Sequence, residues 1–141
     1  MTSVVIRRSD YDPAEARMEA GTDIEVLYPS PGAAVVECTG EHDMTTREEV
    51  DRLFGLLVAE NELVVIDVSQ ARFIDSSFVN NVLKADRLAR QKAKALRLQI
   101  GTTPIVRRVL EISGIVEKLD CVESRDEALR PVVAREVAEQ N

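Results

Sequence analysis

The run Phe73-Ile74-Asp75-Ser76-Ser77-Phe78 places one carboxylate and two adjacent hydroxyls directly after an apolar segment, at the start of a predicted helix. Short side-chain oxygens at such a position accept hydrogen bonds from the first backbone N–H groups of a helix, so the run is typical of an N-cap. A single cap needs only one such side chain. The start of a helix after the carboxyl end of a strand is also a frequent site of function in α/β folds. We therefore take Asp75, Ser76 and Ser77 as the centre of the candidate functional site.

The usual catalytic arrangements are missing from the sequence. His42 is the single histidine, and no pattern places it beside a serine, so we interpret it as a loop residue without a catalytic role. The glycines show neither the GxGxxG nor the GxxxxGK spacing of phosphate loops. Cys38 and Cys121 lie far apart, without a CxxC or Cys/His grouping, which predicts two small buried hydrophobes. We predict a protein that is not an enzyme and has no cofactor and no metal site.

The composition indicates one acidic domain. The chain has 141 residues, a length that suits a single hydrophobic core, and its formal net charge is −7. Nucleic-acid binding needs clustered Lys and Arg, so this charge argues against a nucleic-acid partner. The apolar runs are far shorter than the roughly 20 residues that cross a bilayer, and the N-terminus lacks a signal-peptide profile. We predict a cytoplasmic protein without direct membrane insertion.

The first part of the chain predicts an arm followed by a pair of strands. Residues 1–22 carry alternating charge and little periodic pattern, so we assign them to an accessory N-terminal arm and residues 23–141 to a single domain. Ile24 to Tyr28 and Ala33 to Cys38 are rich in apolar residues and are separated by Pro29-Ser30-Pro31-Gly32. This pattern predicts a strand, a turn and a second strand.

Helices and strands then alternate along the chain. Thr46 followed by Glu49 predicts a capping box at the start of a helix. Leu63 to Ile66 is a short apolar run, typical of a central strand that is buried on both faces. The helix at the candidate site comes next, and Leu96 to Ile100 forms the strand after it.

The last third of the chain contains two more helix starts. Thr103 as N-cap and Pro104 at the first helical position open a helix that stops at Gly114. One face of this helix carries Ile105, Val109 and Ile112. Leu119 to Val122 is a short strand, and a capping box at Ser124 opens a C-terminal helix. The order of elements predicts an α/β fold with a mixed, partly parallel sheet of about four to five strands and about four helices.

Four segments of the chain resemble the STAS domain of anti-sigma factor antagonists. They are Gly40-Glu41-His42-Asp43, Val64-Val65-Ile66-Asp67-Val68, Phe73-Ile74-Asp75-Ser76-Ser77 and Leu98-Gln99-Ile100, which precedes the Thr103 helix. The resemblance covers residues 24–130 and rests on the order and spacing of these segments. It implies a STAS-like single domain.

The resemblance also implies a function. In the family, the Asp-Ser-Ser junction is the phosphorylation site, and the match makes Ser77 the phosphoacceptor, with Ser76 as the second choice. The unphosphorylated domain binds an anti-sigma factor that is itself a serine kinase, and this binding frees a sigma factor for transcription. Phosphorylation by that kinase ends the interaction, and a PP2C-type phosphatase restores it. The chain is thus expected to be a bacterial phosphoprotein that regulates transcription by partner switching.

A partner-binding surface around the serine follows from the same resemblance. Its expected residues are Asp43, Asp75, Ser76, Ser77, Phe78 and Asn81. Phe78 departs from the family, whose members commonly have glycine directly after the phosphoserine. Two interpretations of Phe78 stay open: it packs into the core beneath the helix, or it supplies an apolar contact to the partner.

Two other functions are available to the same fold. A STAS domain can be the soluble subunit of a lipid-transport ABC complex, where it binds an ATPase and needs no phosphorylation. A stressosome-type scaffold component is the other, although such proteins usually carry an additional sensory domain. The intact Asp75-Ser76-Ser77 sequence favours the anti-sigma factor antagonist.

Overall fold

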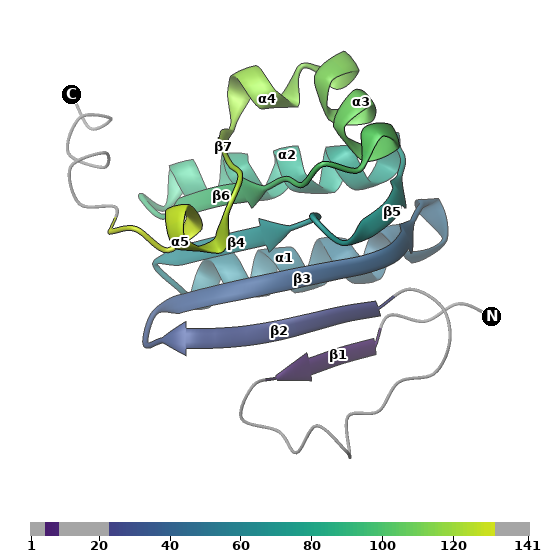
Figure 1. Ribbon diagram of the computed structural model, residues 1–141. Helices are drawn as coiled ribbons and strands as arrows, with labels where there is room; N and C mark the ends of the chain where they lie inside the picture. Colours follow the sequence, from purple (N-terminus) through teal and green to yellow (C-terminus); the bar gives the residue numbers. More distant parts are fainter. Residues whose placement is uncertain (1–4, 9–22, 132–141) are drawn as a thin grey trace.

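The computed structural model describes residues 5–8 and 23–131, which form one mixed sheet with helices on both faces (Figure 1). The strands are β1 (Val5–Arg8), β2 (Asp23–Ser30), β3 (Ala33–His42), β4 (Leu63–Asp67), β5 (Ala71–Ile74), β6 (Ala95–Gln99) and β7 (Asp120–Val122). The helices are the 3-10 helix η1 (Met44–Thr46), α1 (Arg47–Glu60), α2 (Ser76–Gln91), α3 (Pro104–Ser113), α4 (Ile115–Lys118) and α5 (Arg125–Ala128). The predicted α/β class is confirmed, and the structure adds two strands, β1 and β5, that the sequence did not predict.

Strand β1 belongs to the segment that we assigned to an accessory arm. It pairs in parallel with β2 at the edge of the sheet, where Val5 lies opposite Asp23 and Arg8 opposite Val26. Four residues of the arm are therefore part of the sheet. The other residues of the arm lie outside the described part of the chain.

The strand order is β1-β2-β3-β4-β6-β7, and β5 pairs with the far end of β3. Among the described strands, only β2 and β3 are antiparallel, and the predicted turn joins them. Strand β3 is long enough to pair with β4 along its first half and with β5 along its second half. Gly40, with a φ of 77°, lies at the register shift in the β3–β5 pairing, a conformation that glycine adopts without strain. This arrangement brings the start of α2 to the carboxyl end of the parallel strands.

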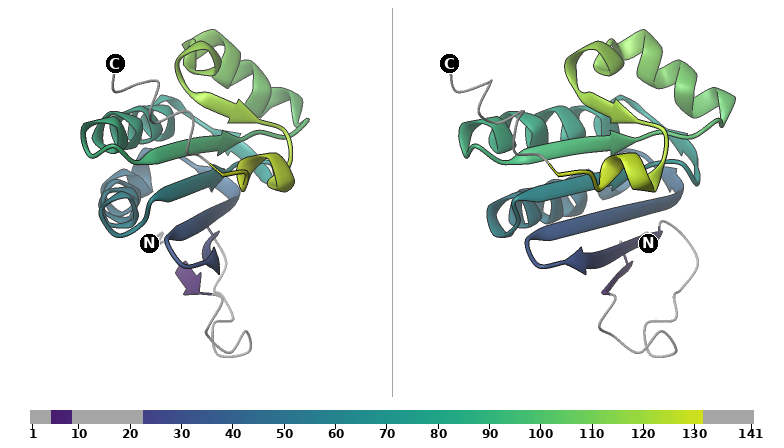
Figure 2. Two further views of the ribbon diagram at one scale, coloured as in Figure 1. Left: turned by 90° about the vertical axis from the view of Figure 1, so that its left-hand side faces the viewer. Right: turned by 60° about the vertical axis from the view of Figure 1, so that its left-hand side comes forward.

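The two faces of the sheet carry cores of unequal size. Helices α1 and α2 lie together on one face, and the short α5 lies on the other (Figure 2). Side chains alternate along β4, so Val64 and Ile66 join the larger core whereas Leu63 and Val65 join the smaller one. The prediction of a central strand buried on both faces is therefore confirmed. Within the described residues, no helix combines the length and apolar character that a membrane span requires.

The start of α1 differs from the sequence prediction. Thr46 occupies the N-cap position, but its side chain makes no capping hydrogen bond, so the capping box with Glu49 is wrong. The Thr46 hydroxyl instead donates to the carbonyl oxygen of Asp43 at 3.5 Å. The side chain of Asp43 caps η1 by accepting a hydrogen bond from the backbone N–H of Thr45 at 3.0 Å. The capping side chain is Asp43 and not Thr46 because η1 precedes α1. The first N–H groups that lack a backbone acceptor therefore belong to the 3-10 turn.

Helix α3 begins with the predicted proline and ends at Gly114, which adopts a φ of 78°. Thr103 is its N-cap residue, without a hydrogen bond from the side chain. The buried side chains of α3 are Val106 and Leu110. The apolar face that the sequence identified looks outward, since Ile105 is 58% and Ile112 is 75% exposed. Helix α3 thus presents apolar side chains to solvent.

Arg125 joins α5 to three strands of the sheet. Glu37, Asp67 and Gln99 lie at one register of β3, β4 and β6. One guanidinium nitrogen donates to Glu37 at 2.7 Å and to Asp67 at 2.6 Å, and the Nε atom donates to Gln99 at 2.9 Å. Only 5% of the Asp67 side chain is exposed, so Arg125 is the cation that compensates a buried charge. Ser124 caps α5 as predicted, which brings Arg125 onto the sheet.

The cysteines are free thiols in protected positions. Cys38 is fully buried, and Cys121 is half-buried, so the prediction of a buried hydrophobe is confirmed only for Cys38. Burial, together with the nearby charges of Asp67 and Glu37, raises the pKa of the Cys38 thiol. Burial and the charge of Asp120 raise the pKa of Cys121 to about 11. Both side chains are therefore protonated at neutral pH.

Candidate functional site

Asp75 links the carboxyl end of β5 to the start of α2. One of its carboxylate oxygens accepts hydrogen bonds from the backbone N–H groups of Ser77 at 2.9 Å and Phe78 at 3.2 Å. The backbone N–H of Asp75 donates to the carbonyl oxygen of His42 at 3.2 Å, which ties the junction to the end of β3. Asp75 is therefore the N-cap of α2, and the predicted strand-to-helix junction is confirmed.

Capping by Asp75 leaves both serine hydroxyls without a structural role. Ser76 is the first residue of α2 and is exposed, whereas Ser77 is the second residue and is half-buried. Ser76 does not cap the helix, because the carboxylate of Asp75 already binds the N–H groups that a serine would take. In the described part of the chain, neither hydroxyl forms a hydrogen bond.

The capping assignment predicts a difference in stability between neighbouring variants. Asp75→Ala is expected to lower the free energy of unfolding by about 1 kcal/mol, because two N–H groups of the first turn lose their acceptor. Ser76→Ala and Ser77→Ala are expected to change it by less than about 0.5 kcal/mol. Urea unfolding followed by circular dichroism measures all three. A loss in either serine variant as large as that of Asp75→Ala would show that a hydroxyl shares the cap.

A second aspartate, Asp43, leaves the sheet at the same edge as Asp75. In the β3–β5 pairing His42 lies opposite Ile74, and each aspartate directly follows one of these two residues. The hydroxyl of Thr45, at 2.6 Å, and its backbone N–H, at 3.0 Å, donate to the Asp43 carboxylate and lower the pKa of that group. Negative charge therefore lies at the end of the sheet where α2 begins.

Two residues expected to bind a partner lie inside the protein. Phe78 is 3% exposed, and its ring packs against Phe54 and His42, with centroid separations of 6.1 and 5.3 Å. Of the two interpretations of Phe78, the structure supports packing beneath the helix. Asn81 is 6% exposed, and its amide donates to the carbonyl oxygen of Arg47 at 3.3 Å, which holds α2 against α1. In this structure both residues position α2.

His42 is a core residue at the end of β3, so its predicted place in a loop is wrong. Its ring is fully buried, and the Nε2 atom lies 2.8 Å from the carbonyl oxygen of Thr39. The sequence pattern ended this strand at Cys38, but pairing with β5 extends it to His42. Because β5 was not predicted, the extension was missed as well.

The surface beside the serines is apolar, which the sequence analysis did not predict. A groove of about 370 Å³ between α2 and α3 includes Ser76 at its edge. Its apolar lining comes from Val79, Leu83, Val109 and Ile112. The large exposed apolar side chains of η1, β5 and α3 are Met44, Phe73, Ile105 and Ile112. The spacing of Ile105, Val109 and Ile112 along α3 was the available signal in the sequence. It showed that these side chains share one face of the helix, but not that this face is turned toward solvent.

This arrangement is suited to contact with another protein. No side chain among the described residues is hydrogen-bonded to the Ser77 hydroxyl as a base. A hydroxyl at a helix start, next to carboxylates and an exposed apolar surface, can instead be modified or bound by a partner.

A comparison with models of known protein families assigns the chain to a family. The family model described as "Mlab, STAS domain" matches residues 28–121. The chain therefore belongs to the STAS domain family, and the resemblance found in the sequence is confirmed. No curated protein matches the chain significantly in sequence.

Several solved structures share this fold. An anti-sigma factor antagonist from Mycobacterium paratuberculosis is 23% identical, with a TM-score of 0.64, over 77% of this chain and 92% of that chain. An anti-sigma-factor antagonist domain protein from Planctomyces limnophilus is 21% identical, with a TM-score of 0.64, over 78% and 97% of the two chains. The phosphorylated form of Bacillus SpoIIAA is 20% identical, with a TM-score of 0.60, over 75% and 96%. At these identities the similarity shows the fold.

Proposed function

We propose that this protein is an anti-sigma factor antagonist that is controlled by phosphorylation of Ser77. The unphosphorylated protein binds an anti-sigma factor serine kinase in the cytoplasm and frees a sigma factor for transcription. Phosphorylation of Ser77 by the kinase ends this binding, and a PP2C-type phosphatase restores it. In this proposal the protein is a binding switch and not an enzyme.

The observation that carries the proposal is the separation of the helix cap from the serine hydroxyls. Asp75 caps α2, so a phosphate can be attached to Ser77 without removing a hydrogen bond from the fold. Ser76, the neighbouring residue, lines the apolar groove between α2 and α3, where a kinase can dock. The choice of Ser77 over Ser76 rests on the resemblance to the family.

Electrostatics explains how one phosphate can end binding while the fold persists. A phosphate adds about −1.5 to −2 charge at the start of α2, where the helix dipole stabilises it by roughly 0.3–1 kcal/mol. The same charge lies next to Asp75, and Asp43 leaves the sheet at the same edge. A partner that covers this surface must desolvate the added charge, and an unpaired charge at an interface costs several kcal/mol. SpoIIAA, an anti-sigma factor antagonist with this fold, is known in unphosphorylated and phosphorylated forms.

Phosphopeptide mapping of the protein from its native cells tests the modification directly. Tryptic cleavage after Arg72 and Lys84 releases residues 73–84, whose only hydroxyl side chains are Ser76 and Ser77. We expect one phosphate on this peptide and its loss in a strain that carries Ser77→Ala. Retention of the phosphate in that strain would assign it to Ser76. An unmodified peptide across growth and stress conditions would contradict the phosphorylation switch.

The description of the matching family model keeps a second candidate function open. It names Mlab and makes no mention of a sigma factor. The second candidate is therefore the soluble STAS subunit of a lipid-transport ABC complex, which binds an ATPase without phosphorylation. Identification of the proteins that copurify with the full-length chain separates the two functions, because one predicts a serine kinase and the other a transport ATPase. A stressosome-type scaffold would copurify with further STAS proteins.

A further inference from the structure

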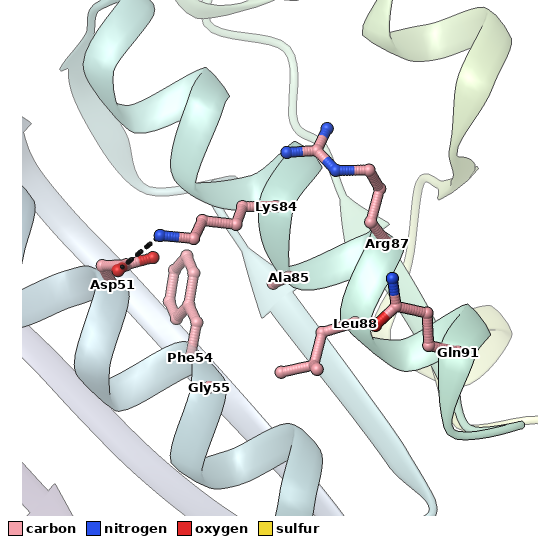
Figure 3. A pocket seen from close by; sticks show the side chains of 8 residues that line it. All are labelled: Asp51, Phe54, Gly55, Lys84, Ala85, Arg87, Leu88 and Gln91. Atoms are coloured by element: carbon pink, nitrogen blue, oxygen red, sulfur yellow. Dashed lines mark hydrogen bonds and ion pairs between the residues drawn. The ribbon is translucent and has the colours of Figure 1, made fainter.

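A second groove lies between α1 and α2, on the solvent side of these helices (Figure 3). It consists of two adjoining hollows of about 350 and 300 Å³, which share Asp51, Lys84 and Arg87. The apolar centre of the larger hollow is formed by Phe54, Gly55 and Leu88. The larger hollow has no lining residue in common with the groove between α2 and α3, whereas the smaller hollow shares Asn80 and Leu83 with it. The larger hollow is therefore the part that is separate from the surface proposed for the kinase.

Gly55 is an unusual residue for its position in the middle of α1. Glycine is less favourable than alanine in the interior of a helix. A Cβ atom added to Gly55 would meet no atom within 4 Å, and the backbone φ angle of Gly55 is not positive. Neither backbone conformation nor packing within the fold therefore requires glycine here. The missing side chain leaves the helix backbone uncovered at the centre of the groove, where another molecule can approach closely.

Exposed cations form one edge of the groove. Lys84 and Arg87 project from α2, and both are exposed. Lys84 pairs with Asp51 at 3.0 Å, whereas Arg87 forms no ion pair with any residue that the structure describes. The two hollows are lined by the cations Arg47, Lys84 and Arg87 and by the carboxylates Glu48 and Asp51. Cations are therefore in slight excess here, in a chain whose net charge is −7, and this excess complements an acidic partner. An apolar centre with a polar rim is also the usual anatomy of a protein interface.

We propose that the α1–α2 groove binds an acidic amphipathic helix of a partner protein. Apolar side chains of that helix lie over Gly55 and Leu88, and its carboxylates contact Lys84 and Arg87. Lys84, Leu88 and Gln91 follow the i, i+4, i+7 spacing and so lie along one face of α2, beside the groove. Because the side chains at its edge are exposed, the groove differs from the enclosed pockets that hold small molecules. This binding goes beyond the proposed phosphorylation switch and does not depend on it.

Two labelled peptides and the full-length protein test the proposal. Both peptides form amphipathic helices with leucines at i, i+3, i+4 and i+7, but one carries glutamates beside the leucines and the other carries lysines. Fluorescence anisotropy measures their affinities. We expect the glutamate peptide to bind at least about tenfold more tightly at low salt, since its charge complements the groove. The difference is expected to shrink as the salt concentration rises.

Variants of the groove locate the binding. Gly55→Leu is expected to weaken binding of the glutamate peptide at least about tenfold by filling the apolar centre. Gly55→Ala is expected to raise the urea concentration at the midpoint of unfolding, because alanine is more favourable than glycine inside a helix. Such a result would show that stability of the fold does not require glycine at this position. Lys84→Glu combined with Arg87→Glu is expected to reverse the preference in favour of the lysine peptide. Arg108→Glu combined with Lys118→Glu is the matched control, because it changes the net charge equally at exposed positions outside the groove.

Specific results would overturn the proposal. These are equal affinities for the two peptides, no binding of the glutamate peptide, or an unchanged affinity in both Gly55→Leu and the double charge reversal. Phosphatidylglycerol vesicles serve as a third probe in a sedimentation assay. If vesicles bind the wild type but not the charge-reversed variant, and the glutamate peptide does not bind, the groove contacts a lipid surface and not a helix.

Discussion

Ser77→Asp is expected to weaken binding of the protein to its anti-sigma factor kinase by at least about tenfold, or ~1.4 kcal/mol, whereas Ser77→Ala is expected to bind like the wild type. The aspartate adds a negative charge to the first turn of α2, beside the capping carboxylate of Asp75. A partner that docks there must desolvate both charges. Alanine removes a hydroxyl that makes no hydrogen bond among the described residues. Calorimetric titration with the copurified kinase measures both affinities.

Ser76→Asp is a comparison variant for this prediction, because it adds the same charge one residue earlier, at the exposed first position of the helix. Ser76 lines the groove proposed for the kinase, so we expect this charge to weaken binding as well. Urea unfolding shows whether each variant keeps the stability of the wild type. Equal affinities of Ser77→Ala and Ser77→Asp for the kinase would contradict the switch and favour the transport-subunit function.

Arg125→Met is expected to lower the free energy of unfolding by about 2–3 kcal/mol. Removing one partner of a fully buried ion pair typically costs about 3–5 kcal/mol, because the other charge stays buried without compensation. The lower value is expected here because 31% of the Arg125 side chain is exposed, although only 5% of the Asp67 side chain is. Urea unfolding at neutral pH measures the loss.

Two further variants separate this ion pair from a general effect of losing an arginine. Arg108→Met removes a cation from an exposed position on α3 and is expected to change stability by less than about 0.5 kcal/mol. Asp67→Asn combined with Arg125→Met is expected to be more stable than Arg125→Met alone, because no buried charge is left unpaired. If the double variant is as unstable as the single one, packing of the arginine stem and not the charge holds α5 on the sheet.

Features encoded within a few neighbouring residues were predictable from the sequence. The apolar run Leu63 to Ile66 identified the central strand, and Gly114 marked the end of α3. The Asp75-Ser76-Ser77 run located the start of α2 because a cap acts on N–H groups within one helical turn. The resemblance to the STAS family rested on the same short segments and is confirmed by the family match over residues 28–121.

Features that depend on distant segments were not predictable in the same way. Strand β5 has only four residues and forms because the end of β3 is available for pairing. That pairing carries His42 into the core. At Thr46 the sequence offered a plausible cap, but the preceding 3-10 turn moved the capping role to Asp43.

The sequence by itself determined the order of β2, β3, α1, β4, α2, β6, α3, β7 and α5, the strand-to-helix junction and the family, because each of these depends on patterns among neighbouring residues. Tertiary structure decided which of the candidate residues are exposed. It turned Phe78 inward against Phe54, and it turned Ile105 and Ile112 of α3 outward. Periodicity places residues on a common face, but the direction of that face depends on how the helix packs against the sheet. The apolar surface beside the serines and the groove at Gly55 exist only once the helices have packed.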